Sequence, residues 1–397
     1  MKKKSLILLI AFFLMGSQVI SSQSKTGNLP VIDISKEYPK KQQRLQEIAD
    51  LEYIPLETTD KVLLSDQDRL SYVSDNYILV HSPVRGDIFV FNRKGKIVFH
   101  FNHRGQSGWE YPGISKRAGV TLDEKNEEIF VCSNSIQVYS LRGEYKRTLK
   151  INTIQYHSKV FNFDNEMLLV YDDVFVEEPN INVKGISKTN PYYFISKKDG
   201  SVISELDIHL PKRYSTRFVQ MSGNNMYRVD ETGFPHSMYY GQDFVISDIS
   251  SDTLYLLTQN KALTPLLSRK PSVHASEPKI IWFTLLTTDK FILIGKFPLS
   301  TNSSSRGGSG RIPVLMYEFK TGEISEISFL DLDAELLRRR WGPGWSPATA
   351  KNMTAELIWP SSLIDAYRTK QLKGDVAKLA MTLDEDDNPI VRIIKFK

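Results

Sequence analysis

Cysteine is nearly absent from this chain, and so is an excess of charge of one sign. Cys132 is the only cysteine among 397 residues, which excludes an internal disulfide and leaves stability to core packing. Lysine and arginine number 51 and aspartate and glutamate 46, a formal net charge of +5. Three of the positive charges are Lys2, Lys3 and Lys4, so without residues 1–24 the balance is 48 basic against 46 acidic residues, a net of +2. A body so nearly neutral gives no electrostatic reason to expect nucleic acid or an anionic membrane surface as a partner.

Motifs of metal and nucleophilic chemistry are also missing from the sequence. The seven histidines are scattered, with none of the HxH or HExxH spacing that zinc sites use. The nearest approach to a nucleophile elbow, 307–311 (GGSGR), lacks the final glycine and lies in a stretch typical of a linker. Cys132 follows the apolar run Ile129–Val131, where a small buried side chain is expected. We therefore predict no cofactor, no metal and no catalytic residue.

The N-terminal segment has the order of parts of a secretory signal peptide. Lys2–Lys4 precede the apolar run Leu6–Leu14 (LILLIAFFL), and small and polar residues follow at Gly16–Ser24. The run is too short to span a bilayer, and no cysteine follows it to carry the lipid of a bacterial lipoprotein. We predict a signal peptide at 1–24 and a mature protein in the periplasm or outside the cell, with no integral membrane segment. An uncleaved anchor or a buried N-terminal helix is the alternative.

Beyond residue 30 the chain consists largely of short β-rich runs that end at turn residues. Asp87–Phe91 (DIFVF), the turn 92–95 (NRKG) and Lys96–Phe101 (KIVFHF) are typical of a β-hairpin. The arrangement returns five more times, the last copy being expected to pair Leu379–Leu383 with Ile390–Phe396. The turn positions are Gly95, Gly143, Gly200, Asn260, Gly322 and Asn388, which are 48, 57, 60, 62 and 66 residues apart.

These six copies predict the fold, because further strand-like runs precede most of the hairpins. Four strands per repeat, arranged radially, form the blade of a β-propeller. The sequence therefore predicts an all-β fold, a single six-bladed β-propeller with four-stranded blades over residues 25–397. The spacing is wider than the roughly 40–50 residues of common blades, which implies loop insertions, among them 172–190 and 299–311. A β-sandwich is the alternative, since it needs no sixfold repeat.

The chain's last hairpin needs a partner from elsewhere to complete its blade. An N-terminal strand that pairs with this blade closes the ring and removes two exposed strand edges. Pro30–Ile34 and Leu51–Leu56 are the two candidates for that strand.

One phrase carries a resemblance to a known family. Phe89–Gly95, followed by 101–111 (FNHRGQSGWEY), resembles the blade phrase of NHL-type propellers. More narrowly, it is similar to the exported six-bladed β-propellers of Bacteroidetes, which are NHL- or TolB-like and whose first blade ends in a glycine-rich phrase closing on Glu-Tyr. The phrases 54–58 (IPLET), 251–255 (SDTLY) and 386–389 (DDNP) agree with it. The resemblance covers nearly the whole mature chain and implies the fold and export, but little about activity.

The sequence departs from the family pattern in two places. Trp109 stands where the usual phrase has a small residue, and a helical insert is expected at about 331–372.

Two segments combine cationic with aromatic side chains and are the candidate ligand-binding sites. In the connection 103–111 the candidates are Arg104, Trp109, Glu110 and Tyr111, which suit stacking on a sugar or hydrogen bonding to an acidic peptide. Glycine placement alone also explains this phrase as a structural inter-blade turn.

The second segment is 338–345 (RRRWGPGW), where the candidates are Arg340, Trp341 and Trp345. The alternative is a helix C-terminus whose arginines complement the helix dipole and whose helix ends at Gly-Pro-Gly.

Two acidic groups are interpreted as solvated. Asp384, Asp386 and Asn388 alternate like the first ligands of a calcium loop, but proline stands where that loop needs glycine and no glutamate closes it, which favours a solvated hairpin tip. Asp172–Asp173 and Glu177–Glu178 lie in a long polar loop, where a solvated cluster is expected rather than an acid–base pair.

Two classes of function follow. The favoured one is an exported, non-enzymatic binding propeller that presents its inter-blade loops to a protein or a carbohydrate. The alternative is a metal-dependent hydrolase or lyase of gluconolactonase-like or amidating-lyase-like type. Such propellers bind a metal through acidic and amide side chains or through histidines, and no set of residues here matches either pattern. Binding is favoured because the fold alone does not imply chemistry.

Overall fold

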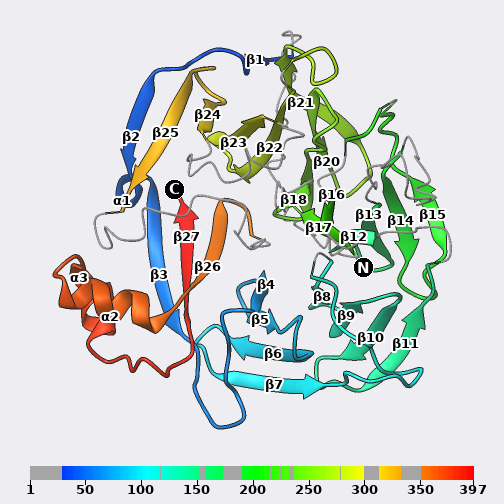
Figure 1. Ribbon diagram of the computed structural model, residues 1–397, viewed down its shortest axis with the longest axis vertical. Coiled ribbons are helices and arrows are strands. Elements are labelled where there is room, and N and C mark those ends of the chain that lie inside the picture. Colours follow the sequence, from blue (N-terminus) through cyan, green and yellow to red (C-terminus); the bar gives the residue numbers. More distant parts are fainter. Residues whose placement is uncertain are drawn as a thin grey trace, which may run out of the picture.

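Six sheets stand radially around a central axis, so the fold is the predicted six-bladed β-propeller (Figure 1). The structure is a computed structural model that describes residues 29–116, 118–151, 157–172, 190–210, 212–214, 217–222, 226–231, 237–277, 279–298, 313–331 and 350–397. In blades one to five, four consecutive strands run as an antiparallel meander from the axis to the rim.

The strands of the first three blades are β4 (Arg69–Val73), β5 (Tyr77–His81), β6 (Asp87–Asn92), β7 (Ile97–Asn102); β8 (Val120–Asp123), β9 (Glu128–Cys132), β10 (Ile136–Ser140), β11 (Tyr145–Leu149); and β12 (His157–Asn162), β13 (Met167–Asp172), β14 (Tyr192–Ser196), β15 (Val202–Glu205). Those of blades four and five are β18 (Ser237–Tyr240), β19 (Asp243–Ile246), β20 (Thr253–Leu257), β21 (Leu263–Lys270); and β22 (Ile280–Thr287), β23 (Phe291–Pro298), β24 (Val314–Glu318), β25 (Ile324–Leu330). A separate hairpin, β16 (Arg217–Ser222) and β17 (Met226–Glu231), stands between blades three and four in the chain.

Blade six joins the two ends of the chain. Its described strands are β26 (Met353–Ile358), β27 (Ile390–Phe396) and β3 (Ala49–Pro55), with β27 in the middle. Ile390 pairs with Pro55 and Phe396 with Ala49 in antiparallel register. Of the two strands expected to close the ring, the one near Leu51–Leu56 therefore does so. The more N-terminal strands β1 (Val31–Asp33) and β2 (Lys40–Arg44) instead add in parallel to the outer edges of blades four and five.

Burial explains why the middle strands read as continuous apolar runs. Each blade is covered by a neighbour on both faces, so β9 is buried at every position. The rim strand β7 instead alternates between buried or half-buried and exposed side chains, because it has solvent on one side. Sequence alternation is thus visible mainly at the rim.

Three of the repeated turn glycines are required for the same structural reason. Gly95, Gly143 and Gly200 join the third and fourth strands of blades one to three and have φ values of 75°, 86° and 84°, which side chains rarely adopt. A Cβ on them would lie 1.9 Å from a backbone oxygen at the end of β3, 2.6 Å from a side chain in β7 and 3.0 Å from one in β11. Each turn therefore packs against the rim strand of the preceding blade, and glycine is required there by both conformation and space.

The helical insert is present and its described helices extend beyond the expected end at 372, residues 332–349 lie outside the described residues, and the last predicted hairpin is wrong. The helices α2 (Pro360–Arg368) and α3 (Gly374–Ala380) lie outside β3 (Figure 1), while β26 occupies part of the range 331–372. Residues 379–380 end α3 and 381–383 follow it, and none of them pairs with β27, whose partners are β26 and β3. The helices bury Leu363 and Val376 against Ile390 and Tyr53, so tertiary packing fixes their place. A short helix, α1 (Leu45–Ile48), joins β2 to β3.

Asn388 is buried, which corrects its interpretation as part of a solvated hairpin tip. Its Oδ1 accepts a hydrogen bond from the N–H of Leu64 (2.8 Å), and its Nδ2 donates to the carbonyl oxygens of Glu57 and Val62 (2.7 Å each). The nearby Asp384 and Asp386 are both exposed, as expected. Asn388 thus ties the start of β27 to the loop that follows β3.

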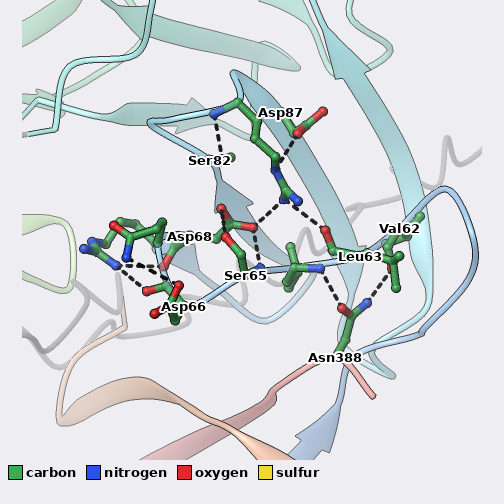
Figure 2. Close-up of polar contacts among 12 residues, drawn as sticks. Val62, Leu63, Ser65, Asp66, Asp68, Ser82, Asp87 and Asn388 are labelled. Carbon is green, nitrogen blue, oxygen red and sulfur yellow. Dashed lines mark hydrogen bonds and ion pairs between the residues drawn. The ribbon is translucent and has the colours of Figure 1, made fainter. Parts of the chain in front are cut away.

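A second set of contacts fixes the same loop (Figure 2). The buried carboxylate of Asp68 accepts hydrogen bonds from the N–H of Ser65 (3.0 Å) and from Arg85 Nη2 (2.7 Å). Arg85 also donates to the carbonyl oxygen of Leu63 (2.9 Å). We call Asn388, Asp68, Ser65 and Arg85 with the loop 57–68 the closure network.

Candidate functional site at the channel mouth

A polar pocket of about 600 Å³ lies where the inner strands of blades one to four meet the turns that join them to their second strands. We call it the channel-mouth pocket. Figure 1 shows β4, β8, β12 and β18 grouped around the centre of the ring. Its lining includes Tyr72, Asp123, Glu124, Asn162, Asp164 and Tyr239.

The fold places these side chains by a repeated rule. Asp123 ends β8 and Asn162 ends β12, so both stand at the inner strand's last position. Glu124 follows directly, and its Oε2 accepts a hydrogen bond from Asn76 Nδ2 in the equivalent turn of blade one (2.9 Å). Asp164 Oδ1 accepts from the N–H of Met167 in its own turn (2.7 Å). The carboxylates are held by the turns and still line the pocket.

Tyr239 and Asn162 leave hydrogen-bonding capacity in the pocket wall. Tyr239 Oη accepts a hydrogen bond from the N–H of Asn162 (2.9 Å), and its ring packs on Phe244 with centroids 5.0 Å apart. Burial raises the pKa of Tyr239, so its hydroxyl keeps a proton that has no acceptor among the described residues. Asn162 Oδ1 is buried and also has no hydrogen-bond partner in the described part of the chain. A donor and an acceptor therefore remain to be satisfied.

A buried ion pair fixes the wall of the channel-mouth pocket on the blade-two side. Lys197 Nζ lies 2.5 Å from Asp123 Oδ2, and the two side chains are only 4% and 3% exposed. Asn126 Nδ2 also donates to Asp123 Oδ2 (2.8 Å), and Lys197 donates to the carbonyl oxygen of Asp164. Removing one partner of such a pair leaves an unpaired buried charge, so these positions are fixed.

The inter-blade connection 103–111 holds four sequence-predicted binding residues, three of which have internal partners. Tyr111 is fully buried, and its hydroxyl donates to the carbonyl oxygen of Gly86 (2.6 Å). Glu110 Oε2 accepts from the N–H of Ser107 (2.8 Å), a hydrogen bond that lowers the pKa of its carboxyl. Arg104 donates to the carbonyl oxygen of Val84.

Trp109 differs from its neighbours in the connection. Its side chain is 44% exposed and meets His103 edge to face, with centroids 5.2 Å apart. The connection enters β8 at Val120, whereas the channel-mouth pocket lies at the other end of β8, at Asp123. Arg340, Trp341 and Trp345 lie outside the described residues, as do the segment 1–24 and most of the loop 172–190.

The pocket residues were not among those predicted from the sequence. Glu124 and Asp164 stand in hairpin turns, where charged residues are ordinary and carry no signal of a site. What the two residues share is their position relative to an inner strand. Glu124 directly follows β8, and Asp164 comes two residues after the end of β12. Comparison of the repeats at that position, rather than at the turn glycines, would have brought them together.

A serine–histidine pair lies within the blades, and its chemistry does not favour the hydrolase alternative. Ser71 Oγ is 2.5 Å from Nδ1 of the buried His81. Burial lowers the pKa of His81 to about 3, so this imidazole is a poor proton acceptor near neutral pH. In the described parts of the chain, no three His, Cys, Asp or Glu side chains are grouped so that they could hold a metal ion.

Comparison with one solved structure supports the fold. A Bacteroides fragilis protein named as an exported protein has a solved structure that matches with a TM-score of 0.61, at 13% identity, over 90% of this chain and 99% of that one. A member of the DUF4221 family from Bacteroides vulgatus matches with a TM-score of 0.44, at 11% identity, over 88% and 97%. No curated protein matches the chain.

None of the helices among the described residues is long and apolar enough to cross a membrane.

One further comparison concerns the family. A family model described as Domain of unknown function (DUF4934) matches residues 29–395, from before β1 to within β27. Since this match covers nearly the whole propeller, the chain belongs to the DUF4934 family.

Proposed function

We propose that this propeller is a non-enzymatic carbohydrate-binding protein and that the channel-mouth pocket holds the sugar. The observation that carries the proposal is the buried Asn162 Oδ1 in the pocket wall, which has no partner among the described residues, together with the Tyr239 hydroxyl, which accepts a hydrogen bond there but donates none, beside the carboxylates of Glu124 and Asp164. A sugar hydroxyl both donates and accepts, so it can satisfy an acceptor and a donor that stand together.

The size and the lining of the pocket favour a sugar over a protein partner. A volume of about 600 Å³ is within the range of small-molecule sites and admits no folded domain. Tyr72 and Tyr239 add aromatic rings, whose apolar bodies and polar tips suit the faces and hydroxyls of a sugar. A protein partner at the inter-blade loops is the competing outcome of the test.

Export belongs to the same proposal. It is supported by the signal-peptide order of residues 1–24 and by the name of the Bacteroides fragilis protein with the same fold. In this proposal the mature chain is free in the periplasm or outside the cell, without a lipid anchor. We also propose that the chain is related to the NHL- and TolB-like propellers.

The test is calorimetric binding of the mature protein to a panel of oligosaccharides. Asn162→Ala removes the unsatisfied acceptor, and we expect it to weaken binding of the best ligand at least about tenfold, as the loss of one good hydrogen bond does. Asn260→Ala is the matched control, because this exposed amide lies in a blade-four turn outside the pocket. Failure of every oligosaccharide to bind, or equal binding by Asn162→Ala and wild type, would overturn the proposal.

A further inference from the structure

A second cavity adjoins the channel-mouth pocket. It has a volume of about 550 Å³ and lies between blades two and three. We call it the basic cleft, and the lining residues that matter are Lys146, Arg147, Lys197, Lys198, Glu128 and Glu166. Asn165 lines both cavities, and the Lys197–Asp123 ion pair joins the wall of one to the wall of the other.

The cations of the basic cleft outnumber its acids. Lys197 is neutralised by Asp123, which leaves Lys146, Arg147 and Lys198 against Glu128 and Glu166. Glu128 is the carboxylate that organises the cleft, since its side chain is 8% exposed and accepts from Arg147 through both oxygens, at 2.7 and 2.6 Å. Lys146 Nζ lies 2.7 Å from the same carboxylate.

These contacts saturate Glu128 but not the cations around it. Arg147 uses its Nε on the carbonyl oxygen of Lys197 (2.7 Å) and one N–H of each terminal nitrogen on Glu128. A guanidinium has five N–H groups, so two of them have no partner among the described residues. The exposed ammonium of Lys198 makes no hydrogen bond or ion pair in the described part of the chain, although it interacts electrostatically with the carboxylate of the adjacent Asp199, and Glu166 is exposed as well.

Burial disfavours the charge on Glu128, but the hydrogen bonds from Arg147 and Lys146 outweigh this and lower the pKa of its carboxyl. Glu128 therefore stays ionised and holds Arg147 in one orientation. A positioned guanidinium with unused N–H groups, in the same cleft as an exposed ammonium, is the donor set that binds a carboxylate.

We infer that the basic cleft binds the carboxylate of an acidic sugar whose neighbouring unit occupies the channel-mouth pocket. This inference rests on the proposed function, since it names the class of saccharide that the pocket takes. The donors of the cleft select a uronate-containing chain over a neutral chain of the same length. Charge attraction across the partly exposed cleft is screened by salt, so the selectivity depends on ionic strength.

The test uses oligogalacturonides of one length as the carboxylate (called the acid below) and as the methyl ester, which have the same sugar units but differ in the charge and in one methyl group per carboxyl. We expect the acid to bind the mature protein at least about tenfold more tightly in low salt, and the advantage to shrink as salt is raised. Lys198→Gln should remove most of that advantage without changing the affinity for the ester. Lys320→Gln, an exposed lysine in the blade-five turn, is the matched control.

Each outcome decides between the two proposals. Equal binding of acid and ester overturns the inference and leaves the sugar pocket standing. A preference for the acid that Lys198→Gln and Lys146→Gln both retain also overturns it, because the carboxylate then lies elsewhere. If neither probe binds and the oligosaccharide panel also fails, the proposed function fails and the inference fails with it.

Discussion

Two polar regions of the propeller, the closure network beside β27 and the channel-mouth pocket beside β8 and β12, differ in how their hydrogen-bonding groups are used. Asn388 uses its amide oxygen once and its amide nitrogen twice, and Asp68 accepts from Ser65 and Arg85 (Figure 2). In the pocket, by contrast, Asn162 Oδ1 is buried without a partner among the described residues.

The difference separates stability from binding. A buried polar group that is satisfied contributes to folding, whereas one left unsatisfied costs free energy unless a ligand or water pairs with it. The closure network holds together segments more than 300 residues apart in the chain: Asn388 donates a hydrogen bond to the carbonyl oxygen of Glu57 and accepts one from the N–H of Leu64. We therefore expect damage to the closure network to unfold the protein, and damage to the pocket to cost affinity.

The largest effect is expected from deletion of 390–397. This removes β27, the middle strand of blade six, where Ile390, Val391 and Ile393 are fully buried. Without it β3 and β26 lose their common partner and the ring opens at two strand edges. We expect loss of the cooperative thermal transition and aggregation in gel filtration. A truncated protein that melts at the wild-type temperature would contradict closure by β27 and β3.

A smaller effect is expected from Asn388→Ala. The substitution removes one acceptor and two donors from the buried side of the loop that follows β3, and we expect a loss of about 2–4 kcal/mol in the free energy of unfolding. Urea unfolding measures it. Asp386→Ala is the control two residues away, at an exposed position that should change stability little. Equal effects of the two substitutions would remove Asn388 from the closure network.

The smallest effect on stability is expected at Trp109. Its side chain is 44% exposed, so Trp109→Ala should lower the free energy of unfolding by less than about 1 kcal/mol. Tyr111→Phe, two residues on, removes the buried hydrogen bond to Gly86 and should cost about 1–2 kcal/mol. Thermal melts of both variants measure the difference. If Trp109→Ala instead abolishes sugar binding, the ligand lies at the inter-blade connection and not at the channel mouth.

Much of the fold could be predicted because its signals are local. A hairpin such as Asp87–Phe101 needs only a short apolar run, a turn and a second run, and these lie within fifteen residues of one another. Gly95, Gly143 and Gly200 predict their turns because a positive φ favours glycine at that one residue. With the equivalent turns at Asn260 and Gly322, they mark blades one to five, whereas the hairpin expected for the sixth blade was wrong.

The sequence was less informative where pairing is distant. The alternatives Pro30–Ile34 and Leu51–Leu56 are both plausible edge strands by composition, and only the packing of blade six selects the second. The predicted hairpin of Leu379–Leu383 failed for the same reason, since β27 finds its partners in β26 and in the N-terminal β3 instead of in the preceding residues.

The sequence by itself thus determined the strand phrases, their turns and the sixfold repeat, because each depends on neighbours in the chain. Only the tertiary structure decided which strand closes the ring and that Asn162, Tyr239 and Glu124 share one pocket. These residues come from three different blades, and closing the ring brings the ends of the inner strands together. The identity of a single turn residue does not show which residues of other blades lie near it, because the distances between turns are set by the packing of whole blades.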